Sequence, residues 1–354
     1  MTSSLRWAAV IALCAALAPQ PQPQAPRPSA FAAQIAALSE APGFFDTDNL
    51  LSNERSYLQV VPELQRRNVR GGAYIGVGPD QNFSYIAAVR PAVAIILDVR
   101  RDNMLLHLLF KALFSLSRTR IEYLALLTGR PVPASLETWR DAPVERLIAY
   151  VDNTAPRPAR LDAAIARIGV PLSADDRATI SRFHGRFVDE GLSLRFQSAG
   201  RPPQAYYPAF RDLLRETDAA GRQANYLASE EAFQFVKGLQ ARDLVIPVTG
   251  DLSGPSALTA IGRLLAARGE RLSAFYVSNV EFYLFGAGTF PRFAGNLERL
   301  PRSANSVLIR SVFGRLSAPV RSGDASSQHV QPVAELLRDH AAGRIRSYAD
   351  IAAR

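Results

Sequence analysis

The chain has 354 residues, of which 48% are hydrophobic and 21% charged, values that are typical of a globular protein and exclude a disordered one. This length allows one large domain or two ordinary ones. The net charge of +9 comes almost entirely from arginine, because Lys111 and Lys237 are the two lysines. A basic surface favours an anionic partner, but the arginines are scattered and form no clear nucleic-acid motif.

Cysteine and histidine are too few to build a metal or disulfide framework. Cys14 is the single cysteine, and the four histidines lie far apart at positions 107, 184, 329 and 340. We therefore expect no intrachain disulfide and no metal site. Chemistry in this chain must depend on carboxylates, amides, hydroxyls and the backbone.

The amino-terminal segment has the layout of a short signal peptide. Arg6 precedes an apolar run at 7–18, and a Pro/Gln-rich stretch follows to residue 28. The run is too short to cross a membrane, and we expect no transmembrane helix elsewhere. We expect residues 1–32 to be a leader and linker, which favours an exported or periplasmic protein. A cytoplasmic location is the alternative, because no good cleavage site follows the apolar run.

Residues 31–40 are predicted to form a short amphipathic helix. In residues 44–67 the apolar residues recur at helical spacing from Leu50, and Pro62 should kink or restart that helix. A cluster of polar residues at 46–53 lies where this helix is expected to begin. It has two interpretations: the side chains cap the helix, or they form a lid over a ligand. The lid candidates are Asp46, Asp48 and Asn49.

A strand, a glycine turn, a helix and a second strand follow in residues 71–98. The runs 73–78 and 94–99 are continuously apolar, as in strands covered on both faces, and residues 82–89 form the intervening helix. A long apolar helix is then predicted from Asp102 or Asn103 to Gly129. Further helices without strands should fill 131–240.

The sheet pattern resumes at 243–254, with a helix at 256–268. A strand at 272–285 should break at Ser278 and Asn279, and another is expected at 304–312. Residues 330–354 should be helical, with a break near Gly343. The pattern predicts an α/β fold with a Rossmann-like, doubly wound, mostly parallel sheet and a large helical insertion after the second strand. Its parts are 33–102, the insertion 103–240, and 241–354.

Small and acidic residues end the first two strands. Gly76, Gly78 and Asp80 form a turn that lets a ligand approach the backbone and the next helix N-terminus, although a tight turn also needs glycine for steric reasons. Asp98 ends the second strand about 20 residues after Gly78, where a carboxylate binds ribose hydroxyls in doubly wound folds. Its alternative role is to cap the helix that begins near Asp102.

The pattern recurs at the next two strands. Gly250 and Asp251 follow one, and Ser278 and Asn279 follow the other, with Glu281 two residues on. Ligands bind at the carboxyl ends of parallel strands, so we expect these groups to meet.

This order resembles the class I S-adenosylmethionine-dependent methyltransferase superfamily over about residues 44–102 and 240–315. The resemblance implies S-adenosyl-L-methionine as cofactor, with Gly76 and Gly78 around its methionine part, Asp98 on the ribose and Asp251 at the adenine edge. Asp80 and Gly250 are further cofactor-binding candidates. It also implies that Ser278, Asn279 and Glu281 form the reaction end. The sequence departs from the family in Pro79-Asp80, in Tyr74-Ile75 where an acidic residue is usual, and in its Ser-Asn-Val-Glu motif.

Three functions are compatible with these residues. The first is methyl transfer to an unknown small-molecule or anionic acceptor. The second is an exported, non-catalytic relative that binds another nucleotide-like ligand or a protein partner. The third, a nicotinamide dinucleotide enzyme, requires a glycine at position 81, where the chain has Gln81.

Overall fold

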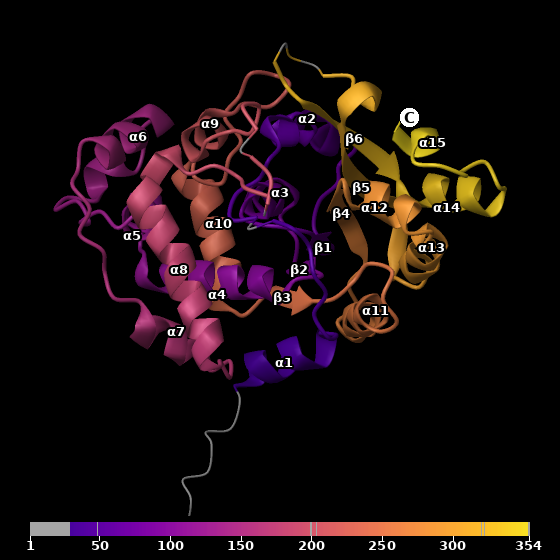
Figure 1. The fold of residues 1–354 in the computed structure, drawn as a ribbon, viewed down its shortest axis with the longest axis horizontal. Helices are drawn as coiled ribbons and strands as arrows, with labels where there is room; N and C mark the ends of the chain where they lie inside the picture. The colour runs from indigo at the N-terminus through magenta and orange to yellow at the C-terminus, as the bar shows by residue number, and fades with distance from the viewer. Residues whose placement is uncertain are drawn as a thin grey trace, which may run out of the picture.

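A six-stranded sheet forms the centre of the protein (Figure 1). The computed structural model describes residues 29–47, 49–198, 200–202, 204–319, 321 and 323–352. The strand order is β3-β2-β1-β4-β5-β6, with five parallel strands and β6 antiparallel to β5. The strands are β1 (Ala73–Gly76), β2 (Val93–Asp98), β3 (Val245–Thr249), β4 (Leu272–Ser278), β5 (Arg302–Phe313) and β6 (Ser326–Pro332). The predicted α/β fold with a mostly parallel sheet is therefore confirmed.

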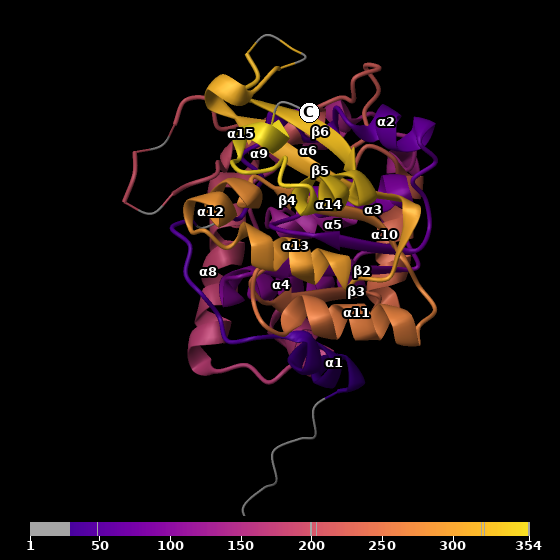
Figure 2. The ribbon, with the colours of Figure 1, turned by 90° about the vertical axis from the view of Figure 1, so that its right-hand side faces the viewer.

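Helices cover both faces of the sheet (Figures 1 and 2). One face is covered by α3 (Gln81–Val89), α4 (Arg101–Leu116) and α10 (Glu230–Ala241), with α2 (Val61–Arg66) beside α3. The other face carries α1 (Ala30–Leu38), α11 (Ala257–Ala267), α13 (Phe290–Glu298) and α14 (Val333–Ala341). Burial on both faces explains why β1, β2 and β3 are continuous apolar runs.

Between β2 and β3 the described chain consists of helices and loops, with isolated bridges and no longer strand, as the sequence predicts. The single long helix expected after Asp98 is wrong, because the chain breaks at Ser117, whose hydroxyl donates to the Leu113 carbonyl, and Thr119 caps a new helix. Outside α4 lie α5 (Arg120–Leu127), α6 (Val144–Asp152), α7 (Asp162–Ile168), α8 (Ala174–Glu190) and α9 (Phe210–Arg215), with the 3-10 turns η2 (Glu137–Trp139) and η3 (Gly191–Ser193). Whether 103–240 is a separate cap stays a prediction.

The segment ahead of β1 is only partly helical. Residues 44–47 and 49–54 form no helix, and the 3-10 turn η1 (Arg55–Leu58) and α2 follow, so the α-helix predicted from Leu50 begins only at Val61. Residues 1–28 of the expected leader lie outside the described residues. The end of that leader belongs to the fold, because Phe31 of α1 is buried and Lys111 lies over its ring at 4.3 Å. Among the described helices, none is long and apolar enough to cross a membrane.

The region after β4 contains the largest departures from the sequence pattern. The strand ends at Ser278 as predicted, and α12 (Val280–Gly286) follows where the pattern continued a strand. The strand β6 was missed because its sequence, SSQHVQP, is polar; it pairs with β5 after the 3-10 turn η4 (Gly314–Leu316). A short helix, α15 (Ala349–Ala352), follows α14, with the predicted break at Gly343 between them.

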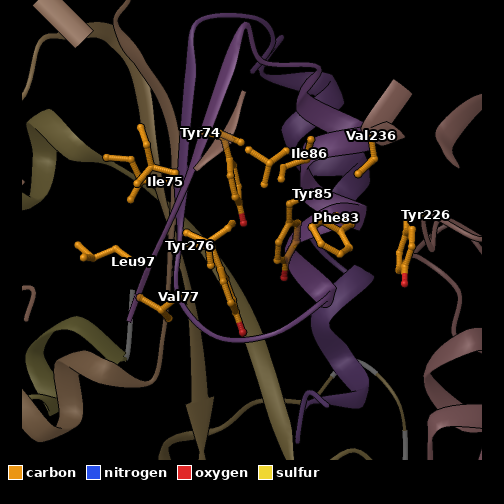
Figure 3. Close-up of a cluster of buried hydrophobic side chains, with 14 of the residues drawn as sticks. Tyr74, Ile75, Val77, Phe83, Tyr85, Ile86, Leu97, Tyr226, Val236 and Tyr276 are labelled. Atoms are coloured by element: carbon orange, nitrogen blue, oxygen red, sulfur yellow. The ribbon is translucent and has the colours of Figure 1, made fainter. Parts of the chain in front are cut away.

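Tyrosines join the sheet to α3 beneath the carboxyl ends of the strands (Figure 3). Tyr85 of α3 packs on Tyr276 of β4 with ring centroids 4.9 Å apart, and Tyr74 of β1 lies beside both. Each hydroxyl is satisfied: Tyr74 donates to Asn82 at 2.7 Å, Tyr276 to Glu54 at 2.6 Å, and Tyr85 to a backbone carbonyl. These contacts hold the end of β4 in place. The Tyr276 hydroxyl also holds the carboxylate of Glu54 beside this strand.

Candidate functional site

A cavity of about 330 Å³ lies at the carboxyl ends of β1, β2, β3 and β4. It is at the point where the order of strands reverses, between β1 and β4, which is where open α/β sheets bind ligands. Residues from 45–54 and from 196–207 complete its lining. Eight of the residues predicted from the sequence line this cavity: Asp46, Asn49, Gly78, Asp98, Gly250, Asp251, Ser278 and Asn279.

Gly76 does not line the cavity. A Cβ at this position would lie 1.9 Å from Oδ1 of Asn82 and 2.7 Å from the Tyr74 hydroxyl. The Asn82 amide donates to the carbonyls of Val77 and Pro79 at 2.9 and 2.8 Å and so holds the turn together. The glycine is therefore required by packing inside the turn, which is the steric interpretation.

Asp80 is buried in the interior and does not line the cavity. Its carboxyl accepts a hydrogen bond from the Tyr226 hydroxyl at 3.2 Å. Burial raises the pKa of Asp80 to about 7, and the bond from Tyr226 partly offsets this rise. Asp80 therefore belongs to the contact between α3 and the segment before α10, and its predicted role at a cofactor stays a prediction.

Glu281 also lies away from the cavity. Its carboxylate is fully buried and pairs with Arg310 of β5 through two bonds, of 2.6 and 3.2 Å. Because α12 begins at Val280, the Glu281 side chain turns towards β5. Its geometry is that of a structural ion pair. Of the lid candidates, Asp48 lies outside the described residues.

Gly78 forms the wall of the cavity at the end of β1. Its φ of +84° is in the region that glycine occupies without strain, and Gln81 and Asn49 lie against it. Nε2 of His107 in α4 is 2.9 Å from the Gly78 carbonyl, and burial lowers the pKa of His107 to about 4. A neutral histidine therefore fixes this turn from behind.

Asp98 lines the cavity at the end of β2. Its Oδ1 accepts from the Arg100 backbone N–H at 2.9 Å and lies 3.4 Å from the Arg100 Nε. Burial raises the pKa of Asp98, and Arg100 and the Gly78 amide partly offset the rise. The carboxylate thus stabilises the turn into α4 while lining the cavity. The bond to the Arg100 N–H supports the interpretation of Asp98 as a residue of the turn into α4, and ribose binding stays a prediction.

Asp251 is exposed at the cavity edge after β3. Its Oδ1 accepts from the backbone N–H and the hydroxyl of Ser253, at 2.7 and 3.0 Å. The preceding Gly250 is packed so closely that a Cβ would lie 2.6 Å from the Cβ of Ala257. A residue that the sequence did not indicate, Glu40, accepts from the Ser256 N–H at 2.5 Å and caps α11 from outside.

Backbone strain is concentrated at the cavity. Five described non-glycine residues have positive φ, and three of these follow helix C-termini, where that conformation is common. The other two, Asn49 and Ser278, both line the cavity, with φ of 47° and 51°. Strained residues persist where the surrounding structure determines them, and they gather at ligand sites.

Glu54 is a buried carboxylate of the cavity that the sequence did not indicate. Its carboxylate is 1% exposed and accepts from the Tyr276 hydroxyl at 2.6 Å, from the Ser278 hydroxyl, and from the Gln328 amide at 3.1 Å. The sequence signal that could have identified Glu54 is its position as an acidic residue between two largely apolar segments, 50–51 and 56–58. Its contact with β4 spans 222 positions.

Two loops cover the cavity and are joined to each other. The Thr47 hydroxyl donates to the Gln197 carbonyl at 2.8 Å, Thr47 and Ser198 form a bridge, and Arg201 pairs with Asp46. This arrangement places two lid candidates, Asp46 and Asn49, against the cavity. That the loops open and close stays a prediction.

A family model matches residues 50–142 and 196–346, about two thirds of the chain. The chain therefore belongs to this family, which is described as "Domain of unknown function (DUF7790)". The match includes all six strands and leaves out 143–195, which contain α6, α7 and α8. No curated protein matches the chain.

Proposed function

We propose that this DUF7790 protein is a methyltransferase-like enzyme that binds S-adenosyl-L-methionine in the cavity and transfers its methyl group to a second ligand. The observation that carries the proposal is the convergence of four parallel strand ends, with Gly78, Asp98, Asp251 and Ser278, on one cavity. Such convergence at the point where strand order reverses is the binding arrangement of doubly wound sheets.

The strand order supports a Rossmann-like fold of the methyltransferase kind. The order β3-β2-β1-β4-β5 is that of a doubly wound sheet, and an antiparallel strand beside β5 closes its edge. The helices on both faces are consistent with that winding.

The cavity suits an elongated nucleoside. Neighbouring strands lie about 4.8 Å apart, so the ends of β3 and β4 are separated by three strand spacings, about 14 Å. Val99 and Leu252 offer apolar surface near Asp98 and Asp251 for a base. A carboxylate has about four acceptor positions, so Asp98 retains capacity for a ribose hydroxyl beside its contacts with Arg100.

The protein's own contribution to the reaction would be positioning. When bound, S-adenosyl-L-methionine would supply an electrophilic methyl group. Asn279 lines the same cavity beside Ser278, and its amide can orient a nucleophile with both a donor and an acceptor. Aligning the reacting atoms in a site that excludes water accounts for most of the rate gain in such a transfer.

A second function is favoured by arginine at the site. Arg100 and Arg201 line the cavity, and Arg100 already pairs with the carboxylate proposed for the ribose. Guanidinium groups bind phosphate well, so the alternative is a non-catalytic protein that holds a phosphorylated nucleotide. Residues 1–28, on which export depends, are outside the described residues, and export stays a prediction.

Calorimetric titration of the full chain with S-adenosylhomocysteine tests the proposal. We expect saturable binding with one site per chain. Asp98→Asn should weaken it about tenfold, because a charged hydrogen-bond acceptor to the ribose is lost. Asp175→Asn is the matched control, since Asp175 is exposed on α8 and lies outside the cavity.

The outcomes separate the two functions. Binding of S-adenosylhomocysteine that Asp98→Asn weakens and Asp175→Asn leaves unchanged supports the methyltransferase-like site. Absence of binding, or equal binding by both variants, contradicts it. Binding of ADP in place of S-adenosylhomocysteine would favour the phosphorylated ligand.

A further inference from the structure

Glu54 carries a buried carboxylate at the cavity without a cation to balance it. In the described chain, no arginine, lysine or histidine forms an ion pair with it, and all its bonds come from neutral donors, Tyr276, Ser278 and Gln328. Burying a charge is costly unless the charge is paired. Oε1 accepts only from Ser278 and can take a further bond.

The other carboxylates of the cavity are in different states. Asp46 pairs with Arg201, and Asp98 pairs with Arg100. Asp251 is exposed to solvent and is bonded by Ser253. Glu54 is therefore the cavity carboxylate at which a ligand cation gains most, because the site is buried and the charge is held by neutral groups.

Aromatic rings form the wall of the same cavity. Phe45 and Tyr283 make an edge-to-face pair with centroids 4.9 Å apart, and Phe196 and Tyr207 make another at 4.8 Å. All four residues line the cavity, and Tyr283 is 41% exposed at its mouth. Aromatic faces favour flat apolar groups and attract cations.

Glu54 lies at the end of the cavity away from the proposed nucleoside. Its partners come from β4 and β6, on one side of β1, whereas Asp98 and Asp251 follow β2 and β3 on the other side. Tyr283 and Asn279 line the same cavity as Glu54. This position fits the second ligand of the reaction better than its methyl donor.

We propose that Glu54 binds the ammonium group of an amine acceptor that carries a flat apolar group. The proposal rests on the proposed function, since it identifies the chemical class of the second ligand at that site. The carboxylate and the hydroxyl of Ser278 hold the ammonium, and the aromatic wall holds the flat group. The methyl-accepting atom is left unassigned.

Two probe ligands that differ in one group test the proposal. Tyramine and 4-(2-hydroxyethyl)phenol share a flat phenol and a two-carbon arm, and they end in an ammonium and a hydroxyl. In calorimetric titrations of the full chain saturated with S-adenosylhomocysteine, we expect tyramine to bind about tenfold or more tightly. Glu54→Gln should remove this preference, while Glu54→Asp and the exposed control Glu137→Gln should keep it.

The outcomes decide the proposal in each case. Equal binding of the two probes by the unmodified chain, absence of tyramine binding, or an unchanged preference in Glu54→Gln overturns it. The comparison in the unmodified chain needs no variant, so a Glu54→Gln protein that fails to fold leaves the proposal falsifiable.

Two further measurements separate this proposal from the proposed function. If S-adenosylhomocysteine binds and tyramine does not, the amine proposal alone fails. If S-adenosylhomocysteine does not bind, the same probes are titrated against the ligand-free chain, which still tests Glu54. A Glu54→Gln effect on S-adenosylhomocysteine that 5′-methylthioadenosine does not show would assign Glu54 to the donor's amino acid end and overturn the acceptor assignment.

Discussion

Two buried carboxylates lie near the end of β4, and their hydrogen-bond partners differ. Glu281 pairs with Arg310 through two bonds inside the protein. Glu54 is held by hydroxyls and an amide and lines the cavity. Glu281 therefore has a buried counter-charge, whereas Glu54 has none among the described residues, and a ligand cation can supply one. The presence or absence of a buried counter-charge therefore distinguishes Glu281, which stabilises the fold, from Glu54, which is available to a ligand.

The largest expected effect comes from breaking the internal pair. Glu281→Gln leaves the guanidinium of Arg310 buried without its counter-charge and should lower the free energy of unfolding by about 3–5 kcal/mol. Glu54→Gln should cost less than half as much, because no buried cation loses its partner. Urea unfolding of both variants measures the difference.

The double variant Glu281→Leu/Arg310→Met is the control for this pair. Apolar residues of similar volume remove both charges together, so most of the lost stability should return. Equal losses in Glu281→Gln and Glu54→Gln would contradict the contrast between the two carboxylates.

A third buried carboxyl, Asp80, extends the comparison to pH. Its pKa is raised to about 7, so the folded protein binds a proton that the unfolded chain has released, and its contribution to stability falls as pH rises from about 4 to 7. Asp80→Asn removes this pH-dependent loss of stability, because the amide does not titrate. The stability of the variant relative to the parent should therefore increase between pH 4 and pH 8, by up to about 4 kcal/mol.

Taking the difference between the variant and its parent isolates this effect. The lowered pKa of His107, about 4, makes the protein less stable as pH falls from about 6.5 to 4, but it acts equally in both proteins. A difference in unfolding free energy that is the same at pH 4 and pH 8 would contradict the raised pKa of Asp80.

The sequence predicts the strand ends well because their signal is local. An apolar run followed by glycine, a carboxylate or serine marks Gly78, Asp98, Asp251 and Ser278, and parallel strands bring their ends to one edge. The glycine signal was ambiguous for Gly76, since packing around Asn82 requires the same residue. Local spacing also gives no direction for a side chain, so Glu281 was placed in the site although α12 turns it towards β5.

The remaining features depend on contacts between distant segments. Glu54 reaches Tyr276 and Ser278 from a loop that precedes β1, and no spacing rule connects these positions. The strand β6 has buried serines and glutamine in place of an apolar alternation, because it pairs at the sheet edge with β5. The position of Glu54 and the formation of β6 are both determined by contacts between segments that are distant in the sequence.

A crystal structure of the full chain grown with S-adenosylhomocysteine tests the central claim most directly. The account predicts electron density for the nucleoside at the carboxyl ends of β1 to β4, with a ribose hydroxyl within hydrogen-bond distance of the Asp98 carboxylate and the sulfur towards Ser278. A cavity without nucleoside density at a saturating ligand concentration, or a nucleoside bound elsewhere on the protein, would contradict it.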